Sequence, residues 1–375
     1  MILIKVDFQT KKDIAAIHWE WFKLRMTKQC PWEKKRTQSY YDFIKENVCL
    51  DSSNLSDSEY KEKLRLLICG LPKGSNKTFF EKINQLNSQK DWYSHQKLVK
   101  KTGENRKKFK NRKMEAKLCV ENLKKAFGYD DLSHSPDYKD WKSWEKSNPW
   151  YVQFKINNGD KDWNTKVLYN ELKLSVCPYC NRQYIFSYQK GNYSKNTAEM
   201  DHFYPKSSFP HLSCSLYNLV PSCKVCNHTK LTDNPDEFLY PYEESFEENP
   251  ENLVASFRIR RNDNVNIKFP ITAEETNIKI ETNDENNPYS DKIHSAAKLL
   301  AIEELYTMHK LDLNDLLSRH AQYGKFKRAD LCKLLGVSEE FLKKMVYGFP
   351  LENKKNEEYI LRKFKKDIVE QLESI

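Results

Sequence analysis

Two closely spaced pairs of cysteines constrain this chain more than any other feature of its sequence. Cys177-Pro-Tyr-Cys180 and Cys223-Lys-Val-Cys226 each place two thiols three positions apart. Four thiolates from two such pairs can close tetrahedrally around one Zn²⁺ ion, at about 2.3 Å each. Because a shell of four sulfurs leaves no open position on the metal, the pattern predicts a structural zinc site.

The first pair also matches a redox motif. Cys-Pro-Tyr-Cys occurs in glutaredoxin-like proteins, where it lies between a strand and a helix of a small βαβ domain. Here residues 183–188 have the composition of a strand, and a second cysteine pair follows. The other six cysteines are scattered, and tight pairs in a cytoplasmic chain indicate metal binding rather than disulfides. We therefore favour zinc.

The composition is typical of a soluble globular protein, with 31% charged and 39% hydrophobic residues among 375. No apolar run approaches the roughly 18 residues of a membrane span, and the first residues lack the layout of a signal peptide. We expect a cytoplasmic protein with no membrane partner. The stretch from Gly70 to Thr78 resembles a phosphate-binding loop, but Leu71 and Asn76 stand where that motif needs glycine.

Hydrophobic periodicity predicts an α+β protein, mostly helical around a small core. In the first helix, Ile14, Ile17, Trp21 and Leu24 have the spacing of one buried face. The chain divides into a helical, basic N-terminal region, a core with the cysteine pairs, a short β-rich connector and a helical C-terminal region: 1–170, 171–245, 246–291 and 292–375. Strand-like runs in the connector cover residues 255–260, 265–271 and 277–281.

Positive charge is concentrated before the cysteine pairs. Residues 1–180 carry a net charge of +13, residues 181–250 carry −3, and the remainder is neutral. A run from Lys100 to Lys113 contains eight basic residues and one glutamate. Such a run is typical of a surface that binds the phosphates of a nucleic acid, although a solvated helix face has the same composition. The candidate contacts are Arg106, Lys107, Lys108, Lys110, Arg112 and Lys113.

The segment between the cysteine pairs resembles a known family. It contains Asp201-His-Phe-Tyr-Pro205, then Asn218-Leu219, then Cys223-x-x-Cys226-Asn227-x-x-Lys230. This series resembles the zinc-knuckle HNH (ββα-metal) endonucleases over residues 177–230. A weaker resemblance runs through residues 238–242 into the C-terminus. It points to the HNH nucleases of Septu-like bacterial anti-phage defence systems, which are encoded beside ATPases.

The resemblance implies a β-hairpin followed by a helix, and it implies roles for individual residues. Asp201 and His202 would end the first strand, Asn218 would lie in the loop or second strand, and Asn227 would start the helix. His202 is then the general base, which suits an imidazole because it titrates near neutral pH. Asp201 and Asn227 offer the hard oxygen ligands that Mg²⁺ or Mn²⁺ prefers. Asn218 is expected to orient the His202 ring or its segment.

Other polar residues near these motifs have weaker assignments. Lys230, one turn after Asn227, and Arg182, beside the first cysteine pair, are candidate phosphate contacts. Glu199 shares a strand face with Asp201 and is either a support for the metal or a solvated side chain. His228 follows Asn227 directly, so on a helix it points elsewhere.

The predicted function is hydrolysis of phosphodiester bonds by an HNH endonuclease, with structural Zn²⁺ and catalytic Mg²⁺ or Mn²⁺ as cofactors. DNA in anti-phage defence is the favoured substrate. One alternative is a nuclease that cleaves RNA, for example tRNA, since such sites read a phosphate more than a base. Another is a zinc-stabilised nucleic-acid-binding module without catalysis. Because the sequence has no phosphate-binding loop, the resemblance implies a separate ATPase subunit as partner.

Overall fold

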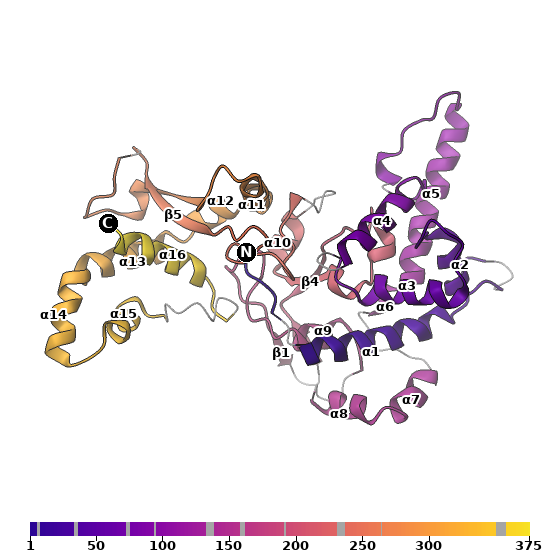
Figure 1. Cartoon of the computed structure of the whole chain (residues 1–375), viewed down its shortest axis with the longest axis horizontal. Helices are drawn as coiled ribbons and strands as arrows, with labels where there is room; N and C mark the ends of the chain where they lie inside the picture. Colours follow the sequence, from indigo (N-terminus) through magenta and orange to yellow (C-terminus); the bar gives the residue numbers. More distant parts are fainter. Residues whose placement is uncertain are drawn as a thin grey trace.

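The computed structural model combines many helices with small antiparallel sheets, which fits the predicted α+β class. It describes residues 1–5, 8–33, 37–72, 76–93, 95–132, 139–157, 162–190, 193–230, 237–263, 265–349 and 358–375. The molecule is elongated, with the N-terminal helices at one end, the C-terminal helices at the other and the short strands between them (Figure 1). No helix among these residues is long and apolar enough to cross a membrane.

The described residues before the first cysteine pair are mostly helical. The α-helices of this N-terminal region are α1 (Phe8–Met26), α2 (Tyr40–Asn47), α3 (Asp57–Cys69), α4 (Lys77–Ser88), α5 (Arg106–Phe127), α6 (Tyr129–Leu132), α7 (Lys139–Lys146), α8 (Pro149–Asn157) and α9 (Thr165–Glu171). A short 3-10 helix, η2 (His95–Lys97), precedes α5. Capping boxes begin α2 and α3, where Ser39 and Ser56 each bond to the backbone and acidic side chain three residues later.

Helix α1 forms the centre of this region. Ile14, Ile17 and Trp21 are fully buried, as their spacing predicts, whereas Leu24 is only half-buried at the edge of the core. His18 lies on the same buried face, where Trp163 Nε1 donates to its Nδ1 at 3.1 Å. The other ring nitrogen, Nε2, donates to the Cys214 carbonyl at 2.7 Å. The imidazole therefore joins the helices to the segment that carries the predicted site.

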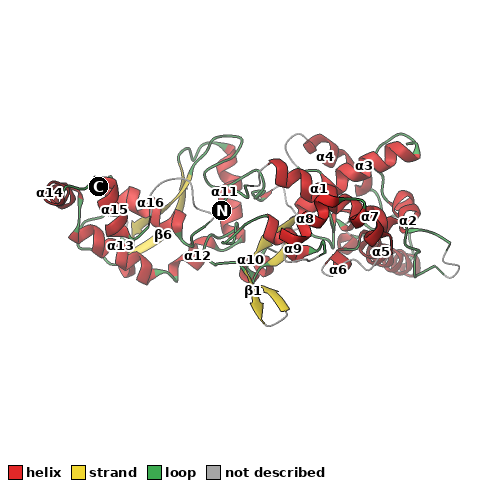
Figure 2. Ribbon diagram, turned by 90° about the horizontal axis from the view of Figure 1, so that it is seen from below, coloured by secondary structure: helices red, strands yellow, loops and turns green. Residues whose placement is uncertain are grey.

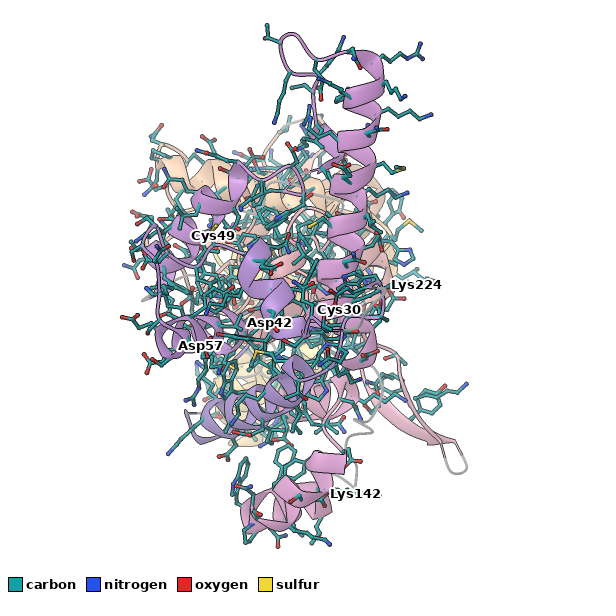
Figure 3. The ribbon with its side chains drawn as sticks, turned by 90° about the vertical axis from the view of Figure 1, so that its right-hand side faces the viewer. Cys30, Asp42, Cys49, Asp57, Lys142 and Lys224 are labelled. Atoms are coloured by element: carbon teal, nitrogen blue, oxygen red, sulfur yellow. The ribbon has the colours of Figure 1, made fainter. Side chains whose placement is uncertain are left out.

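Helix α5 stands out from the body of the molecule (Figure 3). It begins at the cap Asn105, whose side chain accepts from the Lys108 N–H, and it ends at Gly128. Gly128 has φ of +80°, and a Cβ there would overlap the Arg25 side chain, so glycine is required at this turn. The turn leads directly into α6.

Between the helical ends lie two hairpins and a short helix. Strands β1 (Ser187–Lys190) and β2 (Tyr193–Asn196) form a hairpin that projects from the surface (Figure 2). Strand β3 (Glu199–His202) pairs antiparallel with β4 (Leu219–Ser222), and α10 (Lys224–Thr229) follows at once and packs on β3. Two 3-10 turns, η3 (Pro210–Leu212) and η4 (Leu216–Asn218), lie in the connection from β3 to β4.

The C-terminal part is a long hairpin wrapped by helices. Strands β5 (Ala255–Arg261) and β6 (Thr276–Thr282) confirm two of the three strand-like runs, but residues 265–271 form no strand. A proline at position 270 explains this, because proline cannot donate a hydrogen bond to a sheet. A 3-10 turn, η6, and the helices complete the region: η6 (Ala273–Glu275), α11 (Pro288–Leu299), α12 (Ile302–Thr307), α13 (Lys310–Gln322), α14 (Lys325–Leu335), α15 (Glu339–Tyr347) and α16 (Arg362–Glu373).

Candidate functional site

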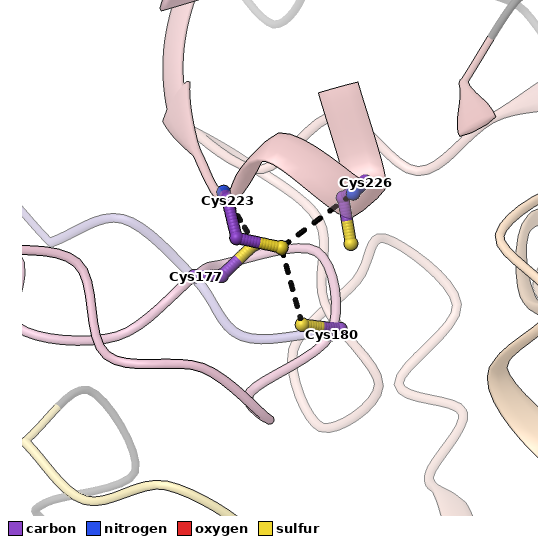
Figure 4. Close-up of side chains that lie close together, drawn as sticks. All are labelled: Cys177, Cys180, Cys223 and Cys226. Atoms are coloured by element: carbon purple, nitrogen blue, oxygen red, sulfur yellow. Dashed lines mark hydrogen bonds between the residues drawn. The ribbon is translucent and has the colours of Figure 1, made fainter. Parts of the chain in front are cut away.

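The four paired cysteines meet in one buried cluster, with their sulfurs within 4.8 Å of one another (Figure 4). Tetrahedral Zn–S bonds of about 2.3 Å place neighbouring sulfurs roughly 3.8 Å apart. The sulfurs of Cys180 and Cys223 lie 3.9 Å apart, so the cluster fits such an ion. All four cysteines are free thiols rather than disulfides. The cluster can hold a metal such as zinc, and this convergence does not fit a two-cysteine redox motif.

Backbone N–H groups point at these sulfurs and suit them as thiolates. The N–H of Cys223 donates to Cys177 Sγ at 3.3 Å, and the N–H of Arg182 donates to Cys180 Sγ at 3.4 Å. Cys223 is also the N-cap of α10, where its sulfur accepts from the Cys226 N–H. Hydrogen bonds to the charged form favour that form, and metal binding requires it. Arg182 therefore supports the cluster through its backbone.

Tyr179, between the first two cysteines, connects the cluster to β3. Its buried hydroxyl donates to Asp201 Oδ2 at 2.5 Å. The same oxygen pairs with the ammonium group of Lys230 at 3.0 Å. Among the described residues no donor reaches Asp201 Oδ1, so this oxygen is available to a metal ion. The Cys-Pro-Tyr-Cys motif alone does not predict this role for Tyr179.

Lys230 lies at the base of the site instead of on its surface. Its side chain is 0% exposed, and its ammonium group donates to the carbonyls of His202 and Phe203 at 3.2 and 3.0 Å. Burial lowers the pKa of this lysine, while the Asp201 charge opposes that shift. The side chain thus fixes the end of β3 and contributes a positive charge from the buried side of the site.

His202 ends β3 with a defined tautomer. Its Nε2 lies 2.9 Å from the Ser213 carbonyl, so it carries the proton and donates there. The remaining nitrogen, Nδ1, then holds the lone pair that can accept a proton. The ring packs edge-on against Tyr129, 4.3 Å between centroids. Burial and the nearby Lys206 lower the pKa of His202 to about 3, so the neutral ring is present at physiological pH.

Asn218 orients the segment around His202 and does not touch the ring. It is fully buried, and its amide donates to the carbonyls of Tyr204 and Leu212 at 3.1 and 2.8 Å. Its side-chain oxygen accepts from the Tyr204 N–H at 2.7 Å. Leu212 directly precedes Ser213, the acceptor for His202. Asn218 is therefore a positioning residue for the carbonyl that sets the histidine tautomer.

Asn227, in α10, lines the same cleft as Asp201. The helix begins at Lys224, three residues earlier than expected, so Asn227 is its fourth residue. Its amide donates to Glu199 Oε2 at 2.7 Å, which directs the amide oxygen away from that carboxylate. The exposed His228 also lies near Glu199, with 3.5 Å between Nε2 and Oε2. Glu199 thus orients Asn227, and His228 interacts with Glu199 on the outer side.

These residues line a cleft of about 690 Å³. Asp201, His202, Asn227 and Lys230 meet there, although they are spread over 30 positions of sequence. The structure adds wall residues that no local motif indicated, because they come from distant helices or from the turn after β3: Gln96, Lys124, Tyr129, Lys206 and Ser207. Met200, within β3, and Pro205, the proline of the Asp201–Pro205 motif, complete the wall. Asn218 and Arg182 lie outside the wall.

The basic run before the site lies mainly in the first half of α5. Arg106, Lys107, Lys108, Lys110 and Lys113 are exposed there. Arg112 differs, because its guanidinium binds Glu104 through two bonds of 2.9 Å and also reaches Asp91 and the Val99 carbonyl. The Glu104 pairing raises the pKa of Arg112 and lowers that of Glu104 to about 2. Arg112 therefore holds the preceding loop against the helix.

Comparisons with known proteins give one partial similarity. The chain is similar to the Septu protein PtuB of Bacillus thuringiensis, 30% identical over 77 residues. The match covers 20% of this chain and 28% of PtuB, so it spans less than a third of that protein's length. No known family matches the chain. No solved structure matches it either.

Proposed function

We propose that this protein is an HNH endonuclease that hydrolyses phosphodiester bonds, with residues 171–245 as its catalytic core. The observation that carries the proposal is the cleft in which Asp201, His202 and Asn227 converge. Two antiparallel strands followed by a helix present them, as the ββα-metal arrangement requires. The four-cysteine cluster adjoins both the hairpin and the helix, because Cys223 directly follows β4 and Cys226 lies in α10. A catalytic site explains why ligand-type oxygens lie beside a histidine with a free lone pair better than a chance grouping does.

Each residue of the cleft has its own role in the proposed hydrolysis. Nδ1 of His202 takes a proton from the attacking water, while its Nε2–H stays bonded to the Ser213 carbonyl. Oδ1 of Asp201 and the amide oxygen of Asn227 are oriented by their other bonds and would hold Mg²⁺ or Mn²⁺. When bound, that ion stabilises negative charge on the scissile phosphate and the departing oxygen. Lys206 and Lys124 on the cleft wall attract the phosphate.

DNA is the substrate that we favour, in anti-phage defence. The similarity to the Septu protein PtuB supports the defence role, because the motifs of residues 177–242 resemble the nucleases of Septu-like anti-phage systems. The positive charge of residues 1–180 supports a polyanionic substrate. We place the contacts with the phosphate backbone on α5, where exposed basic residues are concentrated.

RNA is the second candidate, and the projecting β1–β2 hairpin favours it. Tyr184 and Phe186 lie in the segment that leads into β1, Tyr188 lies in β1, and the three side chains have exposed fractions of 46, 50 and 43%. Side chains two positions apart lie on one face of an extended strand. Exposed aromatic rings in a row can stack on unpaired bases, which RNA loops offer more often than duplex DNA.

A separate nucleotide-hydrolysing subunit is the partner that we propose. The resemblance to nucleases encoded beside ATPases motivates it. The C-terminal helices add a physical reason, because they expose large apolar side chains that a monomer would ordinarily cover. Met308, Leu311, Phe326 and Leu334 are 78 to 89% exposed. Purification from the native host, followed by sizing, tests the proposal, and a lone monomer with full nucleotide-independent activity in cells would refute it.

The deciding experiment compares plasmid DNA and total tRNA as substrates, with and without Mg²⁺ or Mn²⁺. We expect metal-dependent cleavage of one substrate and a loss of about 10²–10⁴ in rate for His202→Ala. His294→Ala is the matched control, because that ring is partly exposed and pairs with Glu285, outside the cleft wall. Wild-type rates in His202→Ala would refute the assignment. Binding without any cleavage, indifferent to His202, would instead support the non-catalytic module.

A further inference from the structure

Helix α5 connects the outer surface of the protein with the cleft. Its N-terminal half projects into solvent, with side chains pointing outward (Figure 3). Near its other end, Lys124 lines the cleft beside His202 and Lys206. A single rigid element therefore runs from the tip of the molecule to the candidate catalytic residues.

The basic residues of α5 are not spread evenly around the helix. Five of them are separated by four, three, four and seven positions, which places them on one face at 3.6 residues per turn. We call this set the basic track: Arg106, Lys110, Lys113, Lys117 and Lys124. Its ends are 18 residues apart, which corresponds to about 27 Å along the helix axis. Lys107, Lys108 and Lys125 lie on other faces, roughly 100° or more away.

In the part of the chain that the structure describes, ion pairs offset little of the positive charge of the basic track. Among the residues that the structure describes, Arg106, Lys110, Lys113 and Lys117 have no acidic partner. Lys124 pairs with Glu121 at 3.2 Å and is the point where the track enters the cleft. Arg112, by contrast, lies on another face and is neutralised by its ion pairs with Glu104 and Asp91.

We propose that the basic track guides the phosphate backbone of a nucleic acid from the tip of α5 into the cleft at His202. This inference rests on the proposed nuclease function and specifies how its substrate approaches. A track of about 27 Å spans roughly 8 base pairs of duplex at 3.4 Å each. The protein therefore binds substrate phosphates far from the scissile one, and these phosphates lie along one face of α5. Lys107 and Lys108 contribute only through the general field of the helix.

The test compares two triple variants with the same change in charge. One removes three track residues, Lys110→Gln, Lys113→Gln and Lys117→Gln, and the other removes three residues off the track, Lys107→Gln, Lys108→Gln and Lys125→Gln. All six side chains are exposed, and Lys124 is left in place to keep the cleft intact. Binding is measured by fluorescence anisotropy on a labelled DNA duplex of about 30 base pairs and on RNA of the same sequence. His202→Ala serves as the background, so that the probes stay uncut.

For the track variant on DNA, we expect the slope of log affinity against log salt to fall by about 2.7, because each lost phosphate contact removes roughly 0.9. The off-track variant should lose less than about 1. The probe with the larger slope change identifies which nucleic acid follows the track. Equal losses in both variants, or a wild-type protein that binds neither probe, would overturn the inference.

The nuclease assignment can fail separately from the track. Track-dependent binding in a protein that cuts neither plasmid nor tRNA would refute the nuclease and support the track. Metal-dependent cleavage with identical salt slopes in both triple variants would refute the track and leave the nuclease standing.

Discussion

Replacement of Tyr179 by phenylalanine tests whether the cysteine cluster and the proposed catalytic metal site are physically coupled. The hydroxyl lies in the first cysteine motif and donates to Asp201 Oδ2 at 2.5 Å in a buried position. A hydrogen bond to a charged acceptor contributes about 1.5–3 kcal/mol. After its loss, Lys230 alone holds Oδ2, and the carboxylate can rotate away from Asn227.

Two effects of this substitution oppose each other. Loss of the donor leaves more electron density on the carboxylate oxygens for a metal ion, which favours metal binding, whereas loss of orientation disfavours it. Removal of a residue that orients a metal ligand typically lowers metal affinity 10- to 100-fold, so orientation should prevail. We expect the Mg²⁺ or Mn²⁺ concentration for half-maximal cleavage to rise by that factor. The rate at saturating metal should stay near that of the wild type.

The assay is a metal titration of cleavage, with direct Mn²⁺ binding as a second readout and zinc content as a third. Tyr60→Phe is the matched control, since its hydroxyl is also buried but bonds to the Val48 carbonyl at 2.9 Å, far from the cleft. It should lose stability without changing metal affinity. An unchanged or tighter metal affinity in Tyr179→Phe, with zinc retained, would refute the coupling.

Two further predictions concern zinc and acid. Cys226→Ser should abolish the one Zn²⁺ per chain that we expect from metal analysis, and it should impair folding, since structural zinc contributes on the order of 10 kcal/mol. Zinc-free wild-type protein that stays folded would contradict this. Burial lowers the pKa of His18 to about 4, below its unfolded value, so its stabilising effect is full above pH 6.5 and is lost as pH falls towards 4. In urea unfolding, this loss should lower the free energy of unfolding by about 2 kcal/mol at pH 5. His18→Gln should remove that part of the pH dependence.

Spacing rules predicted the parts of this protein that depend on short stretches of sequence. The four cysteines lie in one cluster because each pair is fixed by a local turn or a helix start. Asp201 and His202 end a strand, as the motif implied, because Phe203 leaves the hairpin towards the 3-10 turns. The burial of one face of α1 was likewise predicted by the helical spacing of its apolar residues.

Features that depend on distant packing were not accessible in this way. Lys230 was expected at a phosphate, but Tyr179, Phe203 and Asp201 enclose it, and nothing in its local sequence indicates that enclosure. Arg112 lies within a run of exposed basic residues, yet Asp91 and Glu104 neutralise it. The cleft wall draws on α5 and α6, which precede β3 by more than 60 residues, so no motif spans both.

The geometry also explains why the zinc-type cluster and the candidate catalytic residues occur in one segment. Each cysteine pair is connected to one proposed metal ligand. Tyr179, between the cysteines of the first pair, donates a hydrogen bond to Asp201, and Cys226, of the second pair, directly precedes Asn227. An ion that joins the two pairs therefore also fixes the distance between β3 and α10. The C-terminal part depends on the same turn, because Asn181 accepts from the Leu361 N–H at 2.6 Å and Tyr306 donates to the Cys180 carbonyl. Loss of the metal should accordingly disturb the cleft and the docking of α16 together, and this joint loss distinguishes a shared framework from an isolated zinc finger.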